Sequence, residues 1–260
     1  MNKIFIYTLT IILSLTGLKT SFAQINTTEQ KDETASGINL VKINLLALPV
    51  GNFSFQYERA LNQKISAAIS LRLMPESNLP FKSAIENLVD DDETWKHLDK
   101  LKIGNFAITP EVRFYMGENV LKGFYIAPFA RFASYKAKMP FDFEYDHPID
   151  GPKMETIPLD GKITSFTGGV MVGAQWKLSK VVYLDWWILG PSYGTAKGDI
   201  SGKKDLSDPQ EREALRDELK DLETDDVITV TTEVNESGAN VHLKGPWGGV
   251  RAGLAIGYRF

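Results

Sequence analysis

The C-terminal residues of the chain alternate between two kinds of side chain, and this pattern strongly limits the folds available to it. Apolar residues occupy every second position: Val250, Ala252, Leu254, Ile256, Tyr258 and Phe260. The positions between them carry small or charged residues: Gly249, Arg251, Gly253, Ala255, Gly257 and Arg259. A period of two gives a β-strand one apolar face and one small or polar face. The pattern is typical of a strand that separates lipid from the interior of a barrel.

The N-terminal residues predict a signal peptide over residues 1–23. Lys3 provides a basic start, an apolar stretch covers residues 4–18, and residues 21–23 have the small-x-small spacing of a signal peptidase site. This stretch falls short of the roughly 20 apolar residues that a helical span needs. A permanent membrane helix is therefore the less favoured interpretation.

The remainder of the chain offers no helical route into a membrane. We expect the mature protein to begin with a flexible periplasmic segment over residues 24–36, followed by a single domain over residues 37–260. No run in either segment is long and apolar enough for a helical span. An exported chain without such a helix can span a membrane only as a closed barrel, because closure satisfies every backbone hydrogen-bonding group.

Composition narrows the chemistry further. The chain has 260 residues and no cysteine, which excludes disulfides and thiol chemistry. Its formal net charge of −4 speaks against nucleic acid as a partner. The pairs Gly168-Gly169 and Gly248-Gly249 do not lie in a strand-turn-helix unit, so they predict no phosphate loop. No cofactor is expected.

Alternating segments predict eight strands in an all-β, up-and-down antiparallel transmembrane barrel. They cover residues 37–47, 53–58, 65–73, 103–116, 122–132, 163–178, 181–195 and 245–260. The fifth can continue to Tyr145, because Phe141, Phe143 and Tyr145 keep the alternation.

The connections between the predicted strands alternate in length. They are short after the second, fourth and sixth strands and long over residues 74–102, 136–161 and 196–244. Outer-membrane barrels have short periplasmic turns and long external loops, so an even strand count with both termini in the periplasm fits. Aromatic residues are expected at the two membrane interfaces. They are Tyr57, Tyr115, Trp176, Tyr183 and Tyr258 at the inner interface, and Phe106, Tyr135, Tyr193 and Trp247 at the outer one.

The inward positions of the predicted strands are rich in charge. They include Lys42, Glu58, Arg72, Glu111, Arg113, Arg131, Asp185, Arg251 and Arg259. Eight strands enclose an interior that side chains can fill, so we expect these charges to pair with one another. A narrow conducting path or a proton relay is the alternative. Gly249, Gly253 and Gly257 face the same way and are expected to make room for these side chains.

The loop over residues 196–244 predicts a helix and a hairpin. Ser207 or Asp208 can cap the helix, and Pro209 suits its first turn. Its apolar side carries Leu215, Leu219 and Leu222 among many charged residues. Residues 227–234 alternate like a strand, and residues 235–238 are a turn signal. A hairpin reaching into the membrane would make ten strands, which its shortness disfavours.

The loop over residues 74–102 predicts a second helical piece beginning near Pro80. Its apolar side would carry Phe81, Ala84, Ile85 and Leu88. The acidic run over residues 90–93 lacks the spacing of a calcium loop, so we interpret it as a solvated turn and predict no metal site.

The three histidines, His97, His147 and His242, all fall in predicted external loops. His147 with Asp146 and Asp150, or His242 with Ser237 and Glu236, could imitate the site of an outer-membrane lipid enzyme. Neither set has a catalytic motif, and a nucleophile and its base need defined geometry. No enzymatic activity and no catalytic residue are predicted.

The signal peptide, the loop alternation and the pattern Leu254-x-Ile256-x-Tyr258-x-Phe260 resemble the small outer-membrane barrels of Gram-negative bacteria, the group of OmpX, OmpW and the OmpA membrane domain. The resemblance covers residues 37–260. It implies a place in the cell outer membrane, contact with its lipid and lipopolysaccharide, and delivery by the barrel-assembly machinery through the last strand. It does not imply cell-wall anchoring, since no peptidoglycan-binding domain follows the predicted strands.

The function expected from this resemblance is a non-enzymatic role in envelope structure or surface binding, carried by long acidic external loops. An outer-membrane lipid-modifying enzyme and a small-solute pore are the alternatives. The external ligand is not identified by any residue pattern.

Overall fold

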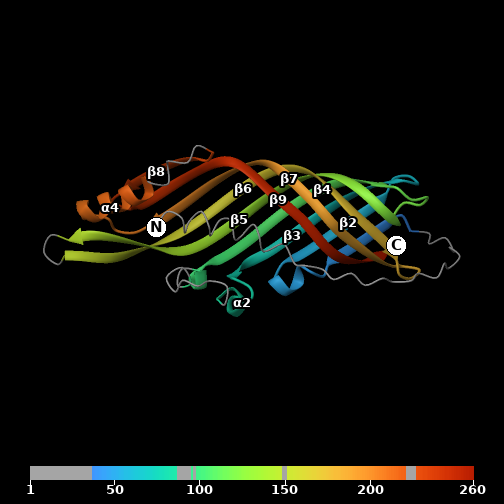
Figure 1. Cartoon of the computed structure of the whole chain (residues 1–260), viewed down its shortest axis with the longest axis horizontal. Coiled ribbons are helices and arrows are strands. Elements are labelled where there is room, and N and C mark those ends of the chain that lie inside the picture. The colour runs from blue at the N-terminus through green and yellow to red at the C-terminus, as the bar shows by residue number, and fades with distance from the viewer. Residues whose placement is uncertain (1–36, 87–94, 96–97, 148–150, 221–226) are drawn as a thin grey trace.

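The protein forms a closed, up-and-down ring of eight antiparallel strands in a computed structural model. The structure describes residues 37–86, 95, 98–147, 151–220 and 227–260. The ring follows the order β1-β2-β3-β4-β5-β6-β7-β9, and β9 pairs with β1 to close it. Figure 1 shows an elongated barrel of tilted strands with α4 and β8 at the end opposite the C-terminus. The predicted all-β, up-and-down antiparallel ring of eight strands is confirmed.

The strands differ greatly in length. In chain order, the elements are β1 (Asn39–Asn44), the 3₁₀ turn η1 (Leu48–Val50), β2 (Phe53–Ala60), β3 (Ile65–Asn78), α2 (Lys82–Glu86), β4 (Lys102–Tyr115), β5 (Gly123–His147), β6 (Gly151–Lys177), β7 (Val182–Lys203), α4 (Pro209–Lys220), β8 (Thr229–Asn235) and β9 (Gly238–Arg259). The strands that form the barrel wall are therefore short at the β1–β2 hairpin, the low side of the wall, and long in β5, β6, β7 and β9, its tall side. Among the described residues, no helix is long and apolar enough to cross a membrane.

The two ends of the described chain close the ring. Leu40 pairs with Arg259, and the backbone N–H of Phe260 donates to the carbonyl oxygen of Asn39 at 2.9 Å. The carbonyl oxygen of Phe260 accepts from the N–H of Asn39 at 3.1 Å. Closure leaves the ladder of the ring without an open edge at this end, which is the condition for satisfying backbone groups in lipid.

Side chains alternate between the two faces of the wall as predicted. In β2, Phe53, Phe55 and Tyr57 are exposed, whereas Ser54 and Gln56 are buried. The same pattern continues round the ring. Exposed apolar residues on the outer face include Val41, Ile69, Leu71, Leu73, Phe106, Val112, Phe114, Phe124, Ile126, Phe132, Phe166, Val170, Val172, Leu189, Val250, Ile256 and Tyr258. The outer face of the ring is therefore a belt of apolar side chains, and its polar side chains point inward.

The predicted loop over residues 136–161 is wrong, because most of it belongs to a hairpin. β5 and β6 pair without interruption from Gly123 and Gln175 to His147 and Gly151. Strand β7 likewise runs on to Lys203, paired with Gly238 of β9. The extra length is stabilised by packing, since Phe143 and Ile157 are fully buried in a cluster with residues of α4.

The external hairpin of the last long connection exists, but it does not enter the ring. Strand β8 pairs with the first part of β9, from Thr229 with Lys244 to Asn235 with Gly238. Within the described residues, β9 is its only partner strand. The ten-strand alternative is therefore excluded by the order of the ring.

Helix α4 begins where the sequence predicts. The side chain of Asp208 caps it by accepting a hydrogen bond from the N–H of Gln210 at 2.9 Å. Leu215 and Leu219 are buried against the extended strands, while Leu222 lies outside the described residues. The extended parts of β5, β6, β7 and β9 pack with β8 and α4 around an apolar core of their own. We call this part of the molecule the outer unit.

The shorter helix α2 packs beside the wall at the same end. Ile85 is buried with Leu79, Leu98 and Leu101. Phe81 is not on this buried side as predicted, because its positive φ of 56° marks a break before the helix and its side chain is exposed. The side chains of Ala84 and Leu88 and the acidic run over residues 90–93 lie outside what the structure describes, as do His97 and the predicted signal peptide.

Candidate functional site: the ion-paired interior

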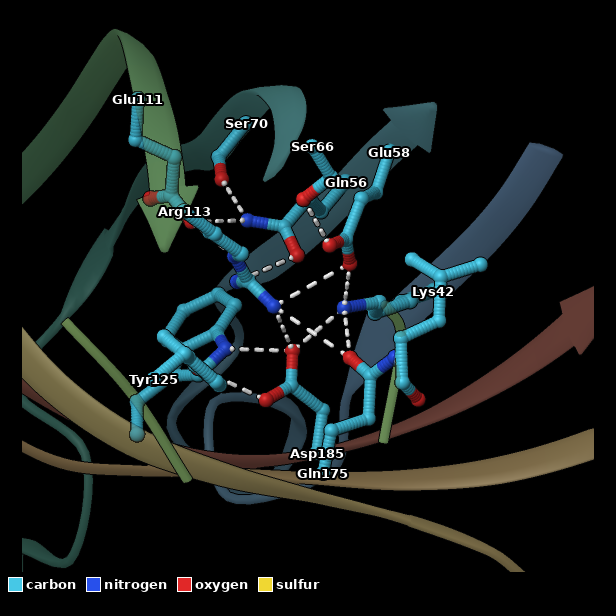
Figure 2. A network of polar contacts seen from close by, with 12 residues as sticks. Lys42, Gln56, Glu58, Ser66, Ser70, Glu111, Arg113, Tyr125, Gln175 and Asp185 are labelled. Carbon is cyan, nitrogen blue, oxygen red and sulfur yellow. Dashed lines mark hydrogen bonds and ion pairs between the residues drawn. The ribbon is translucent and has the colours of Figure 1, made fainter. Parts of the chain in front are cut away.

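A network of charged side chains crosses the interior near the end of the barrel that holds the C-terminus. We call this end the lower end. Lys42 of β1 donates through Nζ to Oε2 of Glu58, to Oε1 of Gln175 at 2.6 Å and to Oδ2 of Asp185 at 2.5 Å. Figure 2 shows these groups converging from β1, β2, β6 and β7. All four side chains are buried, so their charges are compensated by one another and not by water.

Arg113 of β4 supplies the centre of the same network. Its Nε donates to Oε1 of Glu111 at 2.6 Å, and its Nη2 donates to Oε1 of Gln56 at 2.8 Å. Its Nη1 donates to Oδ2 of Asp185 at 2.7 Å and to Oε2 of Glu58 at 3.2 Å (Figure 2). The planar guanidinium can serve several oxygens in one plane, which a lysine could not do.

Aromatic and hydroxyl groups satisfy the remaining oxygens of the carboxylates. Tyr115 donates to Oε1 of Glu58 at 2.7 Å, and Tyr125 donates to Oδ1 of Asp185 at 2.7 Å. The indole of Trp187 donates to Oδ2 of Asp185 at 3.0 Å. Both carboxylates therefore accept hydrogen bonds at both oxygens, which is the condition under which a buried charge is tolerated.

Arg251 extends the network upward and across the full width of the ring. Its Nη1 donates to Oε2 of Glu111 at 3.0 Å, and its guanidinium lies 4.6 Å from the ring centroid of Phe129. Strand β9 lies four places from β4 in either direction round the ring. The pair therefore joins opposite walls, and side chains fill the lumen at this level.

The predicted interior charges do not all belong to this network. The structure brings together Lys42, Glu58, Glu111, Arg113, Asp185 and Arg251. The expectation that every inward charge pairs with another is wrong for the remaining three arginines. Arg259 lies at the lower end and donates to the carbonyl oxygen of Gly37 and to the hydroxyl of Tyr183, each at 2.6 Å. Arg72 and Arg131 lie above the network and contact no carboxylate within the described residues.

Several members of the site were not among the predicted site residues. Gln56, Tyr115, Tyr125, Gln175 and Trp187 all donate or accept within the network. Parity along the strands was the available signal, since Gln56 is two residues from Glu58 and Tyr115 is two residues from Arg113. The prediction instead placed Tyr115 and Tyr183 at a membrane interface, which is wrong because both side chains are buried inside.

Two of the three predicted inward glycines lie where larger side chains would collide. A Cβ at Gly253 would lie 2.3 Å from Nδ2 of Asn44, and one at Gly257 would lie 2.9 Å from Cγ of Lys42. At Gly249 the nearest atom would be Oγ of Ser192 at 3.5 Å, an ordinary contact. A side chain larger than glycine would therefore collide with its neighbours at Gly253 and Gly257, whereas Gly249 has room for a Cβ.

The predicted assembly residues lie on the outer side of β9. Ile256, Tyr258 and Phe260 are exposed there, and Leu254 is half-buried. Their role in recognition by assembly machinery stays a prediction.

Of the histidine arrangements weighed from the sequence, the one around His242 is not formed, and the one around His147 lies partly outside the described residues. The Nδ1 atom of His242 lies 2.7 Å from Oδ1 of Asp199 on the neighbouring strand, and the two side chains are 53% and 79% exposed. The partner of His242 is thus Asp199, and not Ser237 or Glu236. His147 lies 6.2 Å from the ring of Tyr145, and Asp150 lies outside the described residues. Among the described residues there is no cluster of three metal-ligating side chains.

These features define the protein as a closed β-barrel with an apolar outer wall and an interior filled by ion pairs. Within this class, residues 20–199 match the model of a family described as a protein of unknown function, DUF3575. The chain belongs to this family. The match covers β1 to β6 and most of β7, whereas α4, β8 and β9 lie beyond it. No curated protein matches the chain.

Proposed function

We propose that this protein is an integral outer-membrane β-barrel that supports the envelope or binds a partner at the cell surface, without enzymatic activity and without an open channel. The observation that carries this proposal is the apolar belt on the outer wall of a closed ring. Soluble monomers rarely expose apolar patches of more than a few hundred Å². In a bilayer the same belt contacts lipid, and ring closure leaves no unpaired edge there.

The unequal ends of the ring support an orientation for this barrel. The β2–β3, β4–β5 and β6–β7 connections are short and lie at the end that also holds Phe260. The outer unit lies at the opposite end, and α2 belongs to the β3–β4 connection, which leaves the wall on the side away from these short turns. Short turns face the periplasm in known outer-membrane barrels, so the outer unit would face the cell exterior. It would then be the part of the molecule available to a surface partner.

Fractionation of cells tests the location. In a Gram-negative host the full-length protein is expected in the outer-membrane fraction, with a folded form that migrates differently on gels before and after boiling. Protease added to intact cells is expected to cut between Lys203 and Gly238 and to leave the ring intact. Recovery in the soluble periplasmic fraction would contradict the proposal.

Planar bilayer recordings test the closed lumen. The wild-type protein is expected to give no unitary conductance, because Arg251 and Glu111 join opposite walls and Arg113 with Asp185 fills the level below. Steady single-channel currents in the wild-type protein would favour the small-solute pore instead. An open reference porin recorded in the same bilayers controls for insertion.

A further inference from the structure

The charges of the network are balanced, whereas the charges directly above it are not. The paired set contains as many cations as carboxylates: Lys42, Arg113 and Arg251 against Glu58, Glu111 and Asp185. Arg72 and Arg131 point into the same interior from β3 and β5. They add two positive charges for which the described residues supply no carboxylate.

Arg72 lacks the partners that an inward guanidinium requires. Its Nε atom is buried and has no hydrogen-bond partner. Its inward neighbours across the sheet are Ala107 on β4, which has no polar side chain, and Ser54 on β2, whose hydroxyl carries no charge. Arg131 and Arg251 lie close enough to repel its charge. A cation held in this way calls for an anion that the chain itself does not provide.

Among the described residues, the hydrogen-bond partner of Arg131 is a neutral hydroxyl. Its Nη1 lies 3.5 Å from the hydroxyl oxygen of Thr109. Tyr135 follows Arg131 at the same parity on β5. The ring of Tyr135 lies 5.4 Å from that of Trp247. Both aromatic residues have the same inward parity on their strands as the arginines below them. The arginines are thus followed, toward the outer unit, by an aromatic pair.

The three arginines approach the lumen from separate parts of the wall. Arg72 is on β3, Arg131 on β5 and Arg251 on β9, so at least one strand separates each from the next. Between Arg131 and Arg251 lies β7, where Ser192 donates to the carbonyl oxygen of Gly249 at 3.2 Å. The three guanidinium groups are therefore presented to the same interior from three sides, in contrast to the side-chain pairs of the lower network.

We propose that Arg72, Arg131 and Arg251 form a binding site for a phosphoryl group that enters from the end of the outer unit. A phosphate monoester carries a charge of about −1.5 to −2 at neutral pH, which offsets the two unbalanced arginines. Arginine guanidinium groups bind such oxygens in pairs of parallel hydrogen bonds. The site is a property of the folded ring in detergent, so it goes beyond the proposed location and does not depend on it.

Titration calorimetry of the purified full chain in non-ionic detergent tests this site with inorganic phosphate as the probe. Saturable binding is expected, with no comparable signal from potassium chloride at equal ionic strength. Arg72→Gln and Arg131→Gln are each expected to weaken binding at least tenfold. Arg59→Gln is the matched control, since Arg59 is exposed near the opposite end and should leave binding unchanged.

A short-chain phosphatidic acid distinguishes the two sources of a phosphoryl group. Binding at least tenfold tighter than inorganic phosphate would identify a lipid headgroup, and equal binding would identify free phosphate. Both results support the site. The absence of saturable binding for both probes would overturn it, and so would wild-type affinity in folded Arg72→Gln and Arg131→Gln. If Arg72→Gln fails to fold, Arg72→Lys serves instead: weaker binding supports the site, and unchanged binding contradicts it.

Discussion

Asp185 accepts hydrogen bonds from four side chains at once. Lys42, Arg113, Tyr125 and Trp187 all donate to its two oxygens. Removing one member of a buried charge network leaves the others without compensation, which costs more than the loss of one exposed ion pair. At the scale of residues, the interior therefore behaves as one connected unit.

Replacing Asp185 tests this connection. Asp185→Asn is expected to lower the free energy of unfolding by about 3–5 kcal/mol, because Lys42 and Arg113 stay buried with one carboxylate fewer. Urea unfolding of the detergent-folded protein, followed by tryptophan fluorescence, measures the change. Asp199→Asn is the control, because this carboxylate is 79% exposed and its replacement should change stability by about 0.5 kcal/mol or less. Equal midpoints for the two variants would contradict a stabilising network.

A glycine on β6 provides a second test at the same scale. A Cβ at Gly173 would lie 2.4 Å from the hydroxyl oxygen of Tyr125 and 2.8 Å from the carbonyl oxygen of Trp186. Gly173→Ala is expected to displace Tyr125 from Asp185 and to cost about 1–3 kcal/mol. Gly168→Ala on the same strand is the control, because its nearest atom would be 3.9 Å away. Stability of Gly173→Ala equal to that control, again by urea unfolding, would show that Tyr125 has room to move.

Parity along a strand predicted which charges face inward, and it could not predict which of them meet. Arg113 and Asp185 are 72 residues apart in sequence, and their 2.7 Å contact depends on the curvature and register of the closed ring. The same holds for the absence of a carboxylate beside Arg72, because its neighbours Ser54 and Ala107 come from two other strands. Charge type and facing are local properties, whereas pairing is a property of the assembled wall.

At the scale of elements, the outer unit has its own apolar core and is joined to the ring through continuous strands. Leu215 and Leu219 of α4 pack with Phe143 of β5 and Ile157 of β6. The helix was predictable because its capping and apolar spacing are local signals. Alternation allowed β5 to continue to Tyr145. The extension of β6 was missed because the stability of the hairpin comes from α4, which lies more than 50 residues further along the chain.

Truncation of a buried leucine in α4 tests this dependence. Leu215→Ala is expected to destabilise the outer unit by about 2–5 kcal/mol, since it removes a fully buried side chain. Hydrogen exchange is expected to increase in α4 and in the outer parts of β5 and β6, with no change in the ring. Asp217→Ala, on the exposed side of α4, is the matched control. Loss of protection throughout the ring would show that the two parts unfold together.

The salt bridge of Lys204 predicts how the outer unit responds to alkaline pH. Partial burial opposes the charge on Lys204, but the hydrogen bond to Glu155 at 2.5 Å and the ion pair with Glu211 at 2.7 Å raise its pKa above the ordinary value. A raised pKa in the folded state gives stability that is fully present below the unfolded value of about 10.4 and is lost as pH rises through the folded value.

Subtilisin cleavage of the outer unit is therefore expected to be constant from pH 7 to about pH 10 and to accelerate above it. The enzyme's own activity is normalised with an unstructured peptide at each pH. Subtilisin should cleave the Lys204→Gln variant faster than wild type at neutral pH. The increase in cleavage rate above about pH 10 should be mostly lost in this variant. An identical pH profile in wild type and Lys204→Gln would show that other groups control the alkaline response.

At the scale of the whole molecule, the outer face of the ring is apolar all the way round, whereas its two ends differ in structure. The exposed belt from Phe53 and Leu71 round to Val250 and Ile256 is apolar, and the interior is charged. Strands β1 and β2 make the low side of the wall, and β5 to β9 make the tall side. The family match reaches into β7, so the low side and the first half of the tall side share the family's sequence pattern.

The most direct test of the account is spin labelling along β3, which the absence of native cysteine makes straightforward. Single cysteines replace Ile69, Ser70, Leu71, Arg72 and Leu73 in turn, and the labelled proteins are reconstituted in lipid vesicles. Ile69→Cys, Leu71→Cys and Leu73→Cys are expected to collide with oxygen and not with a water-soluble nickel complex. Ser70→Cys should be inaccessible to both reagents. Collision of the nickel complex with the labels at 69, 71 and 73 would contradict a lipid-facing belt and, with it, the membrane barrel.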